Sequence, residues 1–219
     1  QMATSSSVTA VLRFSSSATA SNGCLNTVVK NCNIIGSRHT TTTTTNTFGI
    51  FSGLASATAT VTTISGAADN DNMLLENNNI QRCYYGIYTY GLSSYEHDNL
   101  IIRNNVIGTN VMTNMVGLRG ISTAFTQVTP SASSLIIEGN DIRLGDTLAG
   151  WSANVSAIDL GTTNAGAIIR NNHIHDVRQP STNGFGAYGI FLSTIPYRFY
   201  LQSVRKKRSF YLQQYYQKY

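Results

Sequence analysis

The chain has few charged residues and no long apolar run. Only 11% of its 219 residues are Asp, Glu, Lys or Arg, whereas Ser, Thr, Asn and Gly are plentiful. This composition is typical of an extracellular β-rich protein with polar loops rather than of a cytosolic enzyme. No apolar stretch approaches the ~20 residues that a membrane-spanning helix requires, so no transmembrane segment is expected. We therefore expect a protein that is extracellular or attached to the cell surface.

Cysteine is also scarce. The three cysteines, Cys24, Cys32 and Cys83, are odd in number and lack the spacing of a metal site. We expect small thiols that are buried or half-buried. A disulfide between Cys24 and Cys32 is an alternative that the sequence leaves open.

The net charge of +5 is unevenly distributed. Residues 1–193 carry nine basic and ten acidic side chains, whereas residues 194–219 carry six basic and no acidic ones. Residues 194–219 therefore form a separate tail, for which three interpretations are open. The favoured one is a non-native continuation, as from a shifted reading frame or a fusion junction. The second is a helix from about Leu201 that caps the end of the body. The third, a nucleic-acid or membrane contact through residues 205–208, ranks last, so no nucleic-acid partner is expected.

A nine-residue phrase recurs five times without a gap. Each copy has a short aliphatic run, a charged residue, a polar pair rich in Asn, and an Ile two residues later. Repeated units that stack on their neighbours indicate a solenoid. The copies are residues 26–34, 72–80, 99–107, 134–142 and 166–174.

Each repeat predicts three strands. The aliphatic run fits a strand. Asn and Gly tolerate a left-handed backbone, so the polar pair predicts a tight corner, at which stacked Asn side chains form a ladder. A second strand carries the inward isoleucines Ile34, Ile80, Ile107, Ile142 and Ile174. A third follows at a Gly-Ile motif, with Ile50, Ile87, Ile121, Ile158 and Ile190 inward.

Taken together, these features resemble the right-handed parallel β-helix repeats of pectin lyase-like proteins, over roughly residues 22–193. The resemblance implies an all-β, single-stranded right-handed parallel β-helix of about five rungs in residues 1–193, with a helical or disordered tail. Residues 8–14 read as a strand of an earlier rung and no signal peptide is visible. We therefore expect an N-terminally truncated fragment. The fold hosts lyases, hydrolases, epimerases, adhesins and phage fibres, so it does not fix the function.

Three sets of side chains are candidate sites. Asp69, Asp71, Glu96 and Asp98 precede two neighbouring phrases, and together they predict either a calcium site or a pair of solvated acidic turns. His173 and His175 point to one outward face beside Asp141, which predicts either a surface ion pair or a metal or catalytic site. The outer face of the Gly-Ile strands predicts a carbohydrate-contacting wall, unless loops cover it. Its members are Phe51, Tyr88, Tyr90, Ser122, Asp159 and Phe191.

The resemblance yields no catalytic residue. The Asn-Thr-Asp, Asp-Asp and Gly-His-Gly motifs of the family's hydrolases are not present. Its calcium-dependent lyases combine several aspartates with a proton-abstracting arginine, for which Arg119 is the nearest candidate but has no aspartate pair in the sequence pattern. We expect a non-catalytic fragment of a secreted or cell-surface protein that binds a glycan or has an adhesive or structural role. A polysaccharide lyase or related enzyme acting on an acidic polysaccharide is the first alternative, and a trimeric phage tail-fibre segment is the second.

Overall fold

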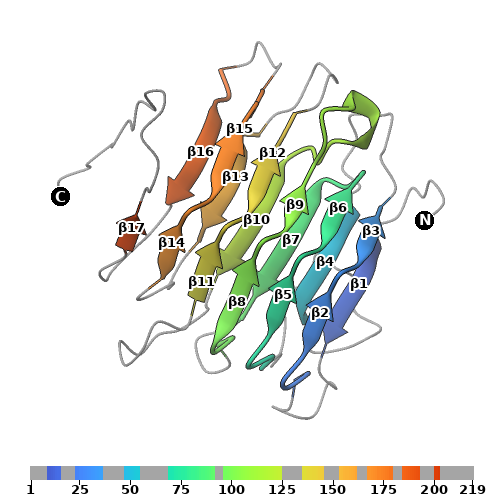
Figure 1. Ribbon diagram of the computed structural model, residues 1–219, viewed down its shortest axis with the longest axis vertical. Helices are drawn as coiled ribbons and strands as arrows, with labels where there is room; N and C mark the ends of the chain where they lie inside the picture. Colours follow the sequence, from blue (N-terminus) through green and yellow to red (C-terminus); the bar gives the residue numbers. More distant parts are fainter. Residues whose placement is uncertain are drawn as a thin grey trace.

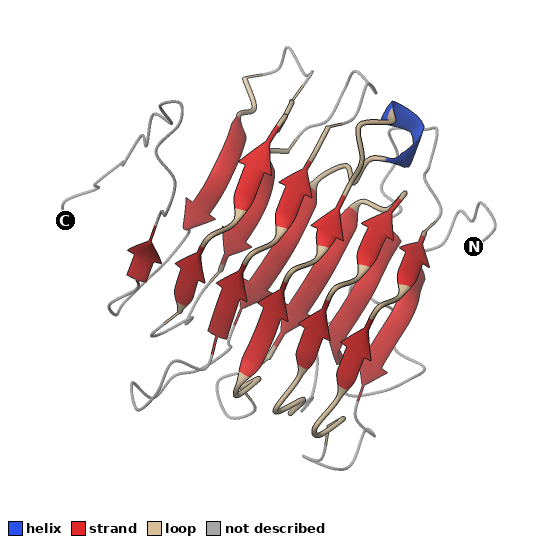
Figure 2. Ribbon diagram, in the orientation of Figure 1, coloured by secondary structure: helices blue, strands red, loops and turns tan. Residues whose placement is uncertain are grey.

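The computed structural model describes ten segments of the chain, and each of them contains at least one β-strand. One short 3₁₀ helix, η1 (Met112–Asn114), interrupts the strands. Figure 2 shows how strongly strand dominates the described part. No helix in these segments is both long and apolar enough to cross a membrane. The described residues are 9–15, 23–36, 47–54, 69–91, 96–124, 135–145, 153–161, 167–179, 184–192 and 200–202.

The strands form three parallel sheets, and successive strands of the chain enter the three sheets in rotation (Figure 1). Sheet A contains β1 (Thr9–Ser15), β4 (Thr47–Leu54), β7 (Tyr85–Tyr90), β10 (Arg119–Ala124), β13 (Val155–Leu160) and β16 (Ala187–Leu192). Sheet B contains β2 (Val28–Lys30), β5 (Leu74–Glu76), β8 (Leu100–Arg103), β11 (Leu135–Glu138), β14 (Ile168–Arg170) and β17 (Tyr200–Gln202). Sheet C contains β3 (Asn33–Ile35), β6 (Asn79–Gln81), β9 (Val106–Ile107), β12 (Asp141–Arg143) and β15 (His173–His175). The fold is therefore an all-β parallel solenoid, as the repeats predict.

Each sheet sends one file of aliphatic side chains into a shared interior. In sheet C the five predicted isoleucines are in register; the first four are at most 2% exposed and Ile174 packs against the core from its edge. Burial of each such side chain contributes about 1.5–3 kcal/mol. The sheet A file is Leu12, Ile50, Ile87, Ile121, Ile158 and Ile190. The sheet B file is Val29, Leu75, Ile102, Ile137 and Ile169.

The corner between sheets B and C has the predicted left-handed backbone. The first residue of each polar pair has a φ of 54° to 63°: Asn31, Asn77, Asn104, Gly139 and Asn171. The first residue of three of the phrases is also left-handed, which was not predicted from the sequence. These residues are Asn26, Asn72 and Asn99. There the Asn99 side-chain amide donates to Asn72 Oδ1 at 2.8 Å.

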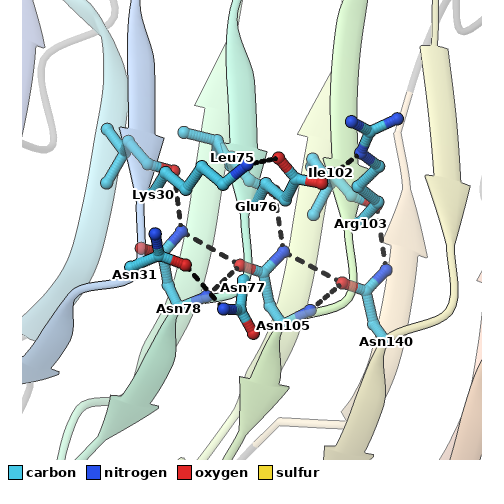
Figure 3. Close-up of polar contacts among 11 residues, drawn as sticks. Lys30, Asn31, Leu75, Glu76, Asn77, Asn78, Ile102, Arg103, Asn105 and Asn140 are labelled. Carbon is cyan, nitrogen blue, oxygen red and sulfur yellow. Dashed lines mark hydrogen bonds and ion pairs between the residues drawn. The ribbon is translucent and has the colours of Figure 1, made fainter.

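The second residues of the polar pairs form a buried asparagine ladder, as predicted (Figure 3). Asn105 Nδ2 donates to Asn140 Oδ1 at 3.0 Å and to the Leu75 carbonyl at 2.9 Å. Asn105 Oδ1 in turn accepts from the backbone and side-chain amides of Asn78, both at 3.0 Å. The ladder continues from Asn140 to Asn172 and ends in the other direction at Cys32, whose backbone amide donates to Asn78 Oδ1. Each buried amide group is thus satisfied by the neighbouring turn.

The charged residue of each phrase forms an alternating row along the outer face of sheet B. Glu76 lies between Lys30, at 2.9 Å, and Arg103, at 2.8 Å, as seen in Figure 3. These two cations lower the pKa of Glu76. In the next turns Arg170 Nε lies 2.7 Å from Glu138 Oε2. Because a slip by one turn would place like charges together, the row favours the observed order of turns.

The glycine of the Gly-Ile motif is explained by a close approach inside the solenoid. A Cβ at Gly86 would lie 2.5 Å from the Gly120 carbonyl oxygen and 2.8 Å from Ile107 Cγ2. A Cβ at Gly49 or at Gly120 would likewise come too close to a carbonyl oxygen of the next turn and to an isoleucine of sheet C. At Gly189 the nearest atom is Ile174 Cγ2 at 3.7 Å, so that position has room for a methyl group.

Two expectations about the ends of the chain can be compared with the structure. The strand expected at residues 8–14 is confirmed by β1, which pairs in parallel with β4. The second-ranked interpretation of the tail, a capping helix from about Leu201, is wrong for Tyr200–Gln202, which form β17 and pair with β14. Leu201 is the register partner of Ile169, so the chain adds a strand to the open edge of sheet B. Residues 203–219, including 205–208, lie outside the described residues.

Replacing Asn105 with Ala should lower the free energy of unfolding by about 3 kcal/mol, because it leaves buried amide and carbonyl groups in two turns unsatisfied. The measurement is urea denaturation followed by circular dichroism. The matched control is Asn33→Ala, which removes only an exposed 3.3 Å bond from Asn79 and should change stability by less than about 0.5 kcal/mol. Equal effects of the two substitutions would contradict the ladder.

Adding a methyl group at Gly86 should destabilise the fold by about 1–3 kcal/mol through overpacking against Ile107 and the Gly120 carbonyl. Gly189→Ala, in the same column, should be nearly neutral because its site is open. Both variants are compared by the same denaturation assay. A tolerated Gly86→Ala would show that the interior spacing is wider than the structure indicates.

Candidate functional site

Two rows of side chains line the outer face of sheet A. The predicted row is in register from turn to turn: Phe51, Tyr88, Ser122, Asp159 and Phe191. A second row comes from the residues before the Gly-Ile pair: Phe48, Tyr85, Arg119, Ser156 and Tyr188. Ring contacts between the rows, such as Phe48 with Phe51 at 5.0 Å and Tyr85 with Tyr88 at 5.4 Å, place both on one side of the sheet.

Sequence reasoning missed the second row because it assumed strict alternation along the strand. A Cβ at Gly49 would point at Ile80 in the interior, so the glycine and the following isoleucine both face inward. The residues on either side of the pair therefore both face outward. The aromatic residue before the glycine in three of the five motifs was the available signal.

One end of this face is a packed aromatic cluster rather than an open wall. Phe51 was expected to line the exterior, but it is fully buried, stacked on Tyr88 at 5.4 Å. Phe48 is 3% exposed and stacks on Tyr85 at 4.7 Å. Burial raises the pKa of both Tyr85 and Tyr88. Phe51 is buried because aromatic side chains that pack against one another remove large apolar areas from water. Tyr88 also stacks on Tyr90 at 6.2 Å, so the rings continue along the strand.

In the middle of the face, Arg119 and Asp159 form an ion pair. Arg119 Nε lies 2.6 Å from Asp159 Oδ2, and both side chains are mostly buried. Arg119 Nη1 also donates to the backbone carbonyls of Leu118 and Asn154. The guanidinium therefore bridges two turns beside Tyr85, whose pKa responds to both charges. This pairing has no counterpart in the sequence pattern, since the two residues are 40 positions apart.

The other end of the face is open. Tyr188 is 36% exposed, and its ring lies 5.3 Å from that of the half-buried Phe191. Ser122 and Asp159 separate this pair from Tyr88 in the same row. The face therefore combines a buried aromatic base, a polar centre and an accessible aromatic end.

The acidic residues lie together where two turns stack, at the corner before β5 and β8. The Asp98 backbone amide donates to Asp71 Oδ1 at 2.8 Å, which confirms the predicted neighbourhood of these two residues. Burial raises the pKa of Asp69 to about 6, and the charge of Asp71 and a hydrogen bond to it act in the same direction. The pKa values of Glu96 and Asp98 are raised as well, and burial is the largest cause for both groups. The carboxylates repel one another, and calcium binding here stays a prediction.

The predicted histidine cluster lies on the outer face of sheet C. His173 pairs in register with Asp141 and His175 with Arg143. His175 Nε2 lies 2.7 Å from Asp141 Oδ1, so the predicted histidine–aspartate pair is present. Asp176, at a left-handed position with φ of 50°, lies within 3.1 Å of His175 Nδ1.

The three cysteines are free thiols. Cys83 is buried, which raises the pKa of its thiol to about 12, and Cys24 is half-buried. Cys32 was expected to be at least half-buried but is exposed, because it occupies the end position of the ladder. The alternative of a Cys24–Cys32 disulfide is therefore not observed.

Compared with known proteins, the chain matches no family model, no curated protein and no solved structure. Its function therefore has to be inferred from the geometry of its own residues.

Replacing Asp69 with Asn should stabilise the fold above about pH 6, where the folded protein must keep this carboxylate charged. The folded pKa is raised from 3.8 to about 6, so wild-type stability should fall as the pH rises between these values and then level off. Solvent screening limits the gain to on the order of 1 kcal/mol or less.

The measurement is the melting temperature of wild type and variant between about pH 3.5 and 8, without and with millimolar calcium. Asp176→Asn is the control of opposite sign, because the pKa of Asp176 is lowered by its hydrogen bond to His175 and by nearby cations. A destabilising Asp69→Asn in calcium-free buffer would contradict the repulsion. If calcium raises the melting temperature of the wild type but not that of Asp71→Ala, the result would support the predicted calcium site.

Proposed function

We propose that this chain is a non-catalytic part of a secreted or cell-surface protein that binds a glycan on the outer face of sheet A, in an adhesive or structural role. The observation that carries the proposal is the row of aromatic side chains beside the Arg119–Asp159 pair. A kinship with pectin lyase-like proteins is part of the same proposal, supported by the repeat phrase and the asparagine ladder.

The chemistry of the face suits a sugar chain. The apolar face of a pyranose ring stacks on an aromatic ring, while charged groups bind its hydroxyls or carboxylates. Tyr188 and Phe191 offer an accessible ring pair, and in the same two rows Asp159 lies one turn and Arg119 two turns before them. Adjacent strands lie about 4.8 Å apart, so an extended glycan running along the solenoid axis meets one turn after another.

A binding role is favoured over hydrolysis because Asp159, the carboxylate of this face, is already paired with Arg119. A glycosidase uses two carboxyl groups on either side of the scissile bond. In this face Asp159 is the carboxylate that the described residues supply, and it is already paired with Arg119 at 2.6 Å. A carboxylate and a guanidinium that are already bonded to each other suit hydrogen bonding to a ligand.

A polysaccharide lyase acting on an acidic polysaccharide is the alternative. Arg119 would have to act as the base, and its half-buried position beside Tyr85 is the observation in favour. Its contacts work against this role, because the guanidinium already donates to Asp159 and to the backbone carbonyls of Leu118 and Asn154.

Tyr188→Ala should weaken binding to the best ligand of a polysaccharide panel by about 2- to 13-fold, since one aromatic stacking contact is worth ~0.5–1.5 kcal/mol. The panel contains neutral polysaccharides together with pectate and alginate, and binding is measured by calorimetry. Val106→Ala is the matched control, because Val106 is 46% exposed on sheet C, away from the proposed face.

Unchanged affinity in Tyr188→Ala, or equal losses in both variants, would contradict binding at this face. Release of unsaturated product from pectate or alginate, abolished by Arg119→Lys, would replace the binding proposal with the lyase alternative.

A further inference from the structure

A cluster on the outer face of sheet C has the composition and spacing of a metal site. It is formed by β12 and β15, away from the aromatic face of sheet A. The donor atoms of Asp141, His173 and His175 all lie within 4.8 Å of one another. Asp141 Oδ1 is central, at 2.7 Å from His175 Nε2 and 3.5 Å from His173 Nδ1. The two imidazoles lie side by side, with ring centroids 4.3 Å apart and 22° between their planes.

These separations are close to those of ligands around one ion. Bonds of about 2.0–2.1 Å in a tetrahedral zinc site place neighbouring donor atoms roughly 3.3 Å apart. The two nitrogen–oxygen distances lie on either side of that value, so small side-chain rotations suffice. The strands fix the approach, because His173 and His175 are two positions apart on one strand and Asp141 is the register partner of His173.

A second layer of side chains orients His175. Its Nδ1 lies 3.1 Å from Asp176 Oδ2, on the side of the ring opposite Asp141. The same Nδ1 lies 3.2 Å from Arg143 Nε and 3.1 Å from Arg143 Nη2. A metal ion on Nε2 requires the proton to be on Nδ1, and Asp176 Oδ2 is the group placed to accept it there. Arg143 Nε lies 3.2 Å from the same Asp176 oxygen, and Arg178 lies 3.6 Å from the other. Asp176 is therefore held in place by His175, Arg143 and Arg178.

The donor set selects the class of metal. Two imidazoles and one carboxylate suit zinc, copper or nickel, whereas calcium and magnesium prefer oxygen ligands. The exposed side chain of His173, at 71%, leaves room for water or an outside group at the fourth position.

We infer that Asp141, His173 and His175 bind a zinc-class transition-metal ion through three protein ligands, with Asp176 orienting His175 and one coordination position open. The site lies on a different sheet from the proposed glycan face, and its test does not depend on glycan binding. It lies on the surface of the regular solenoid wall, so metal binding requires no rearrangement of the interior.

The test is calorimetric titration of the folded protein with zinc chloride, in a Cys32→Ser background that removes the exposed thiol as a competing ligand. One equivalent of zinc should bind, and calcium chloride should give no heat at this site. His173→Ala, His175→Ala and Asp141→Asn should each weaken zinc binding at least ~100-fold, whereas Asp176→Asn should weaken it ~10-fold by removing the orienting carboxylate.

Asp159→Asn is the control, because it removes a carboxylate from sheet A and should leave the zinc isotherm unchanged. Circular dichroism checks that each variant remains folded, as expected for side chains on the outer face. Absence of a zinc-dependent heat, or zinc binding that survives in the His173→Ala/His175→Ala double variant, would overturn the inference. Full affinity in Asp141→Asn would overturn the three-ligand assignment.

Discussion

The buried amides at the corner between sheets B and C impose the central constraint on this fold. A buried side-chain amide that finds no partner costs about 1–3 kcal/mol, and at this corner the partners come from the neighbouring turns. Asn105 is satisfied only when Asn78 lies on one side and Asn140 on the other. The ladder therefore requires turns that stack in one register, and that register in turn aligns the three interior aliphatic files. Loop length is not constrained in this way, because ladder partners are separated by 27, 35 and 32 residues while their bonds stay between 2.9 and 3.0 Å.

A fixed register turns the outside of the solenoid into columns. Side chains at equivalent positions of successive turns become neighbours even though they are tens of residues apart in sequence. The alternating charges around Glu76, the pairing of Arg119 with Asp159 and the approach of His175 to Asp141 all arise in this way. Each candidate site is thus a product of two or three turns, and none is contained in a single repeat.

The interior could be predicted from the sequence, whereas much of the surface could not. Inward isoleucines and corner asparagines repeat at fixed places in the phrase, so their alignment follows once the turns stack. The second aromatic row escaped prediction because Gly49 and Ile50 both face inward, which breaks the alternation of a regular strand. Burial of Phe51 depends on its packing with Phe48 and Tyr88, and the partner of Arg119 depends on side-chain reach across a turn. Acidic and histidine neighbours were predictable because they flank or belong to the repeated phrase itself.

The most direct test of the stacked-corner account is residue-resolved hydrogen exchange by NMR. The backbone amides of Asn78, Asn105 and Asn140, each bonded to the side-chain oxygen of the adjacent ladder residue, should exchange as slowly as the amides of the central strands. Exchange at these three amides as fast as in unstructured chain, while the strands remain protected, would show that the corners are not locked to one another and would contradict the account.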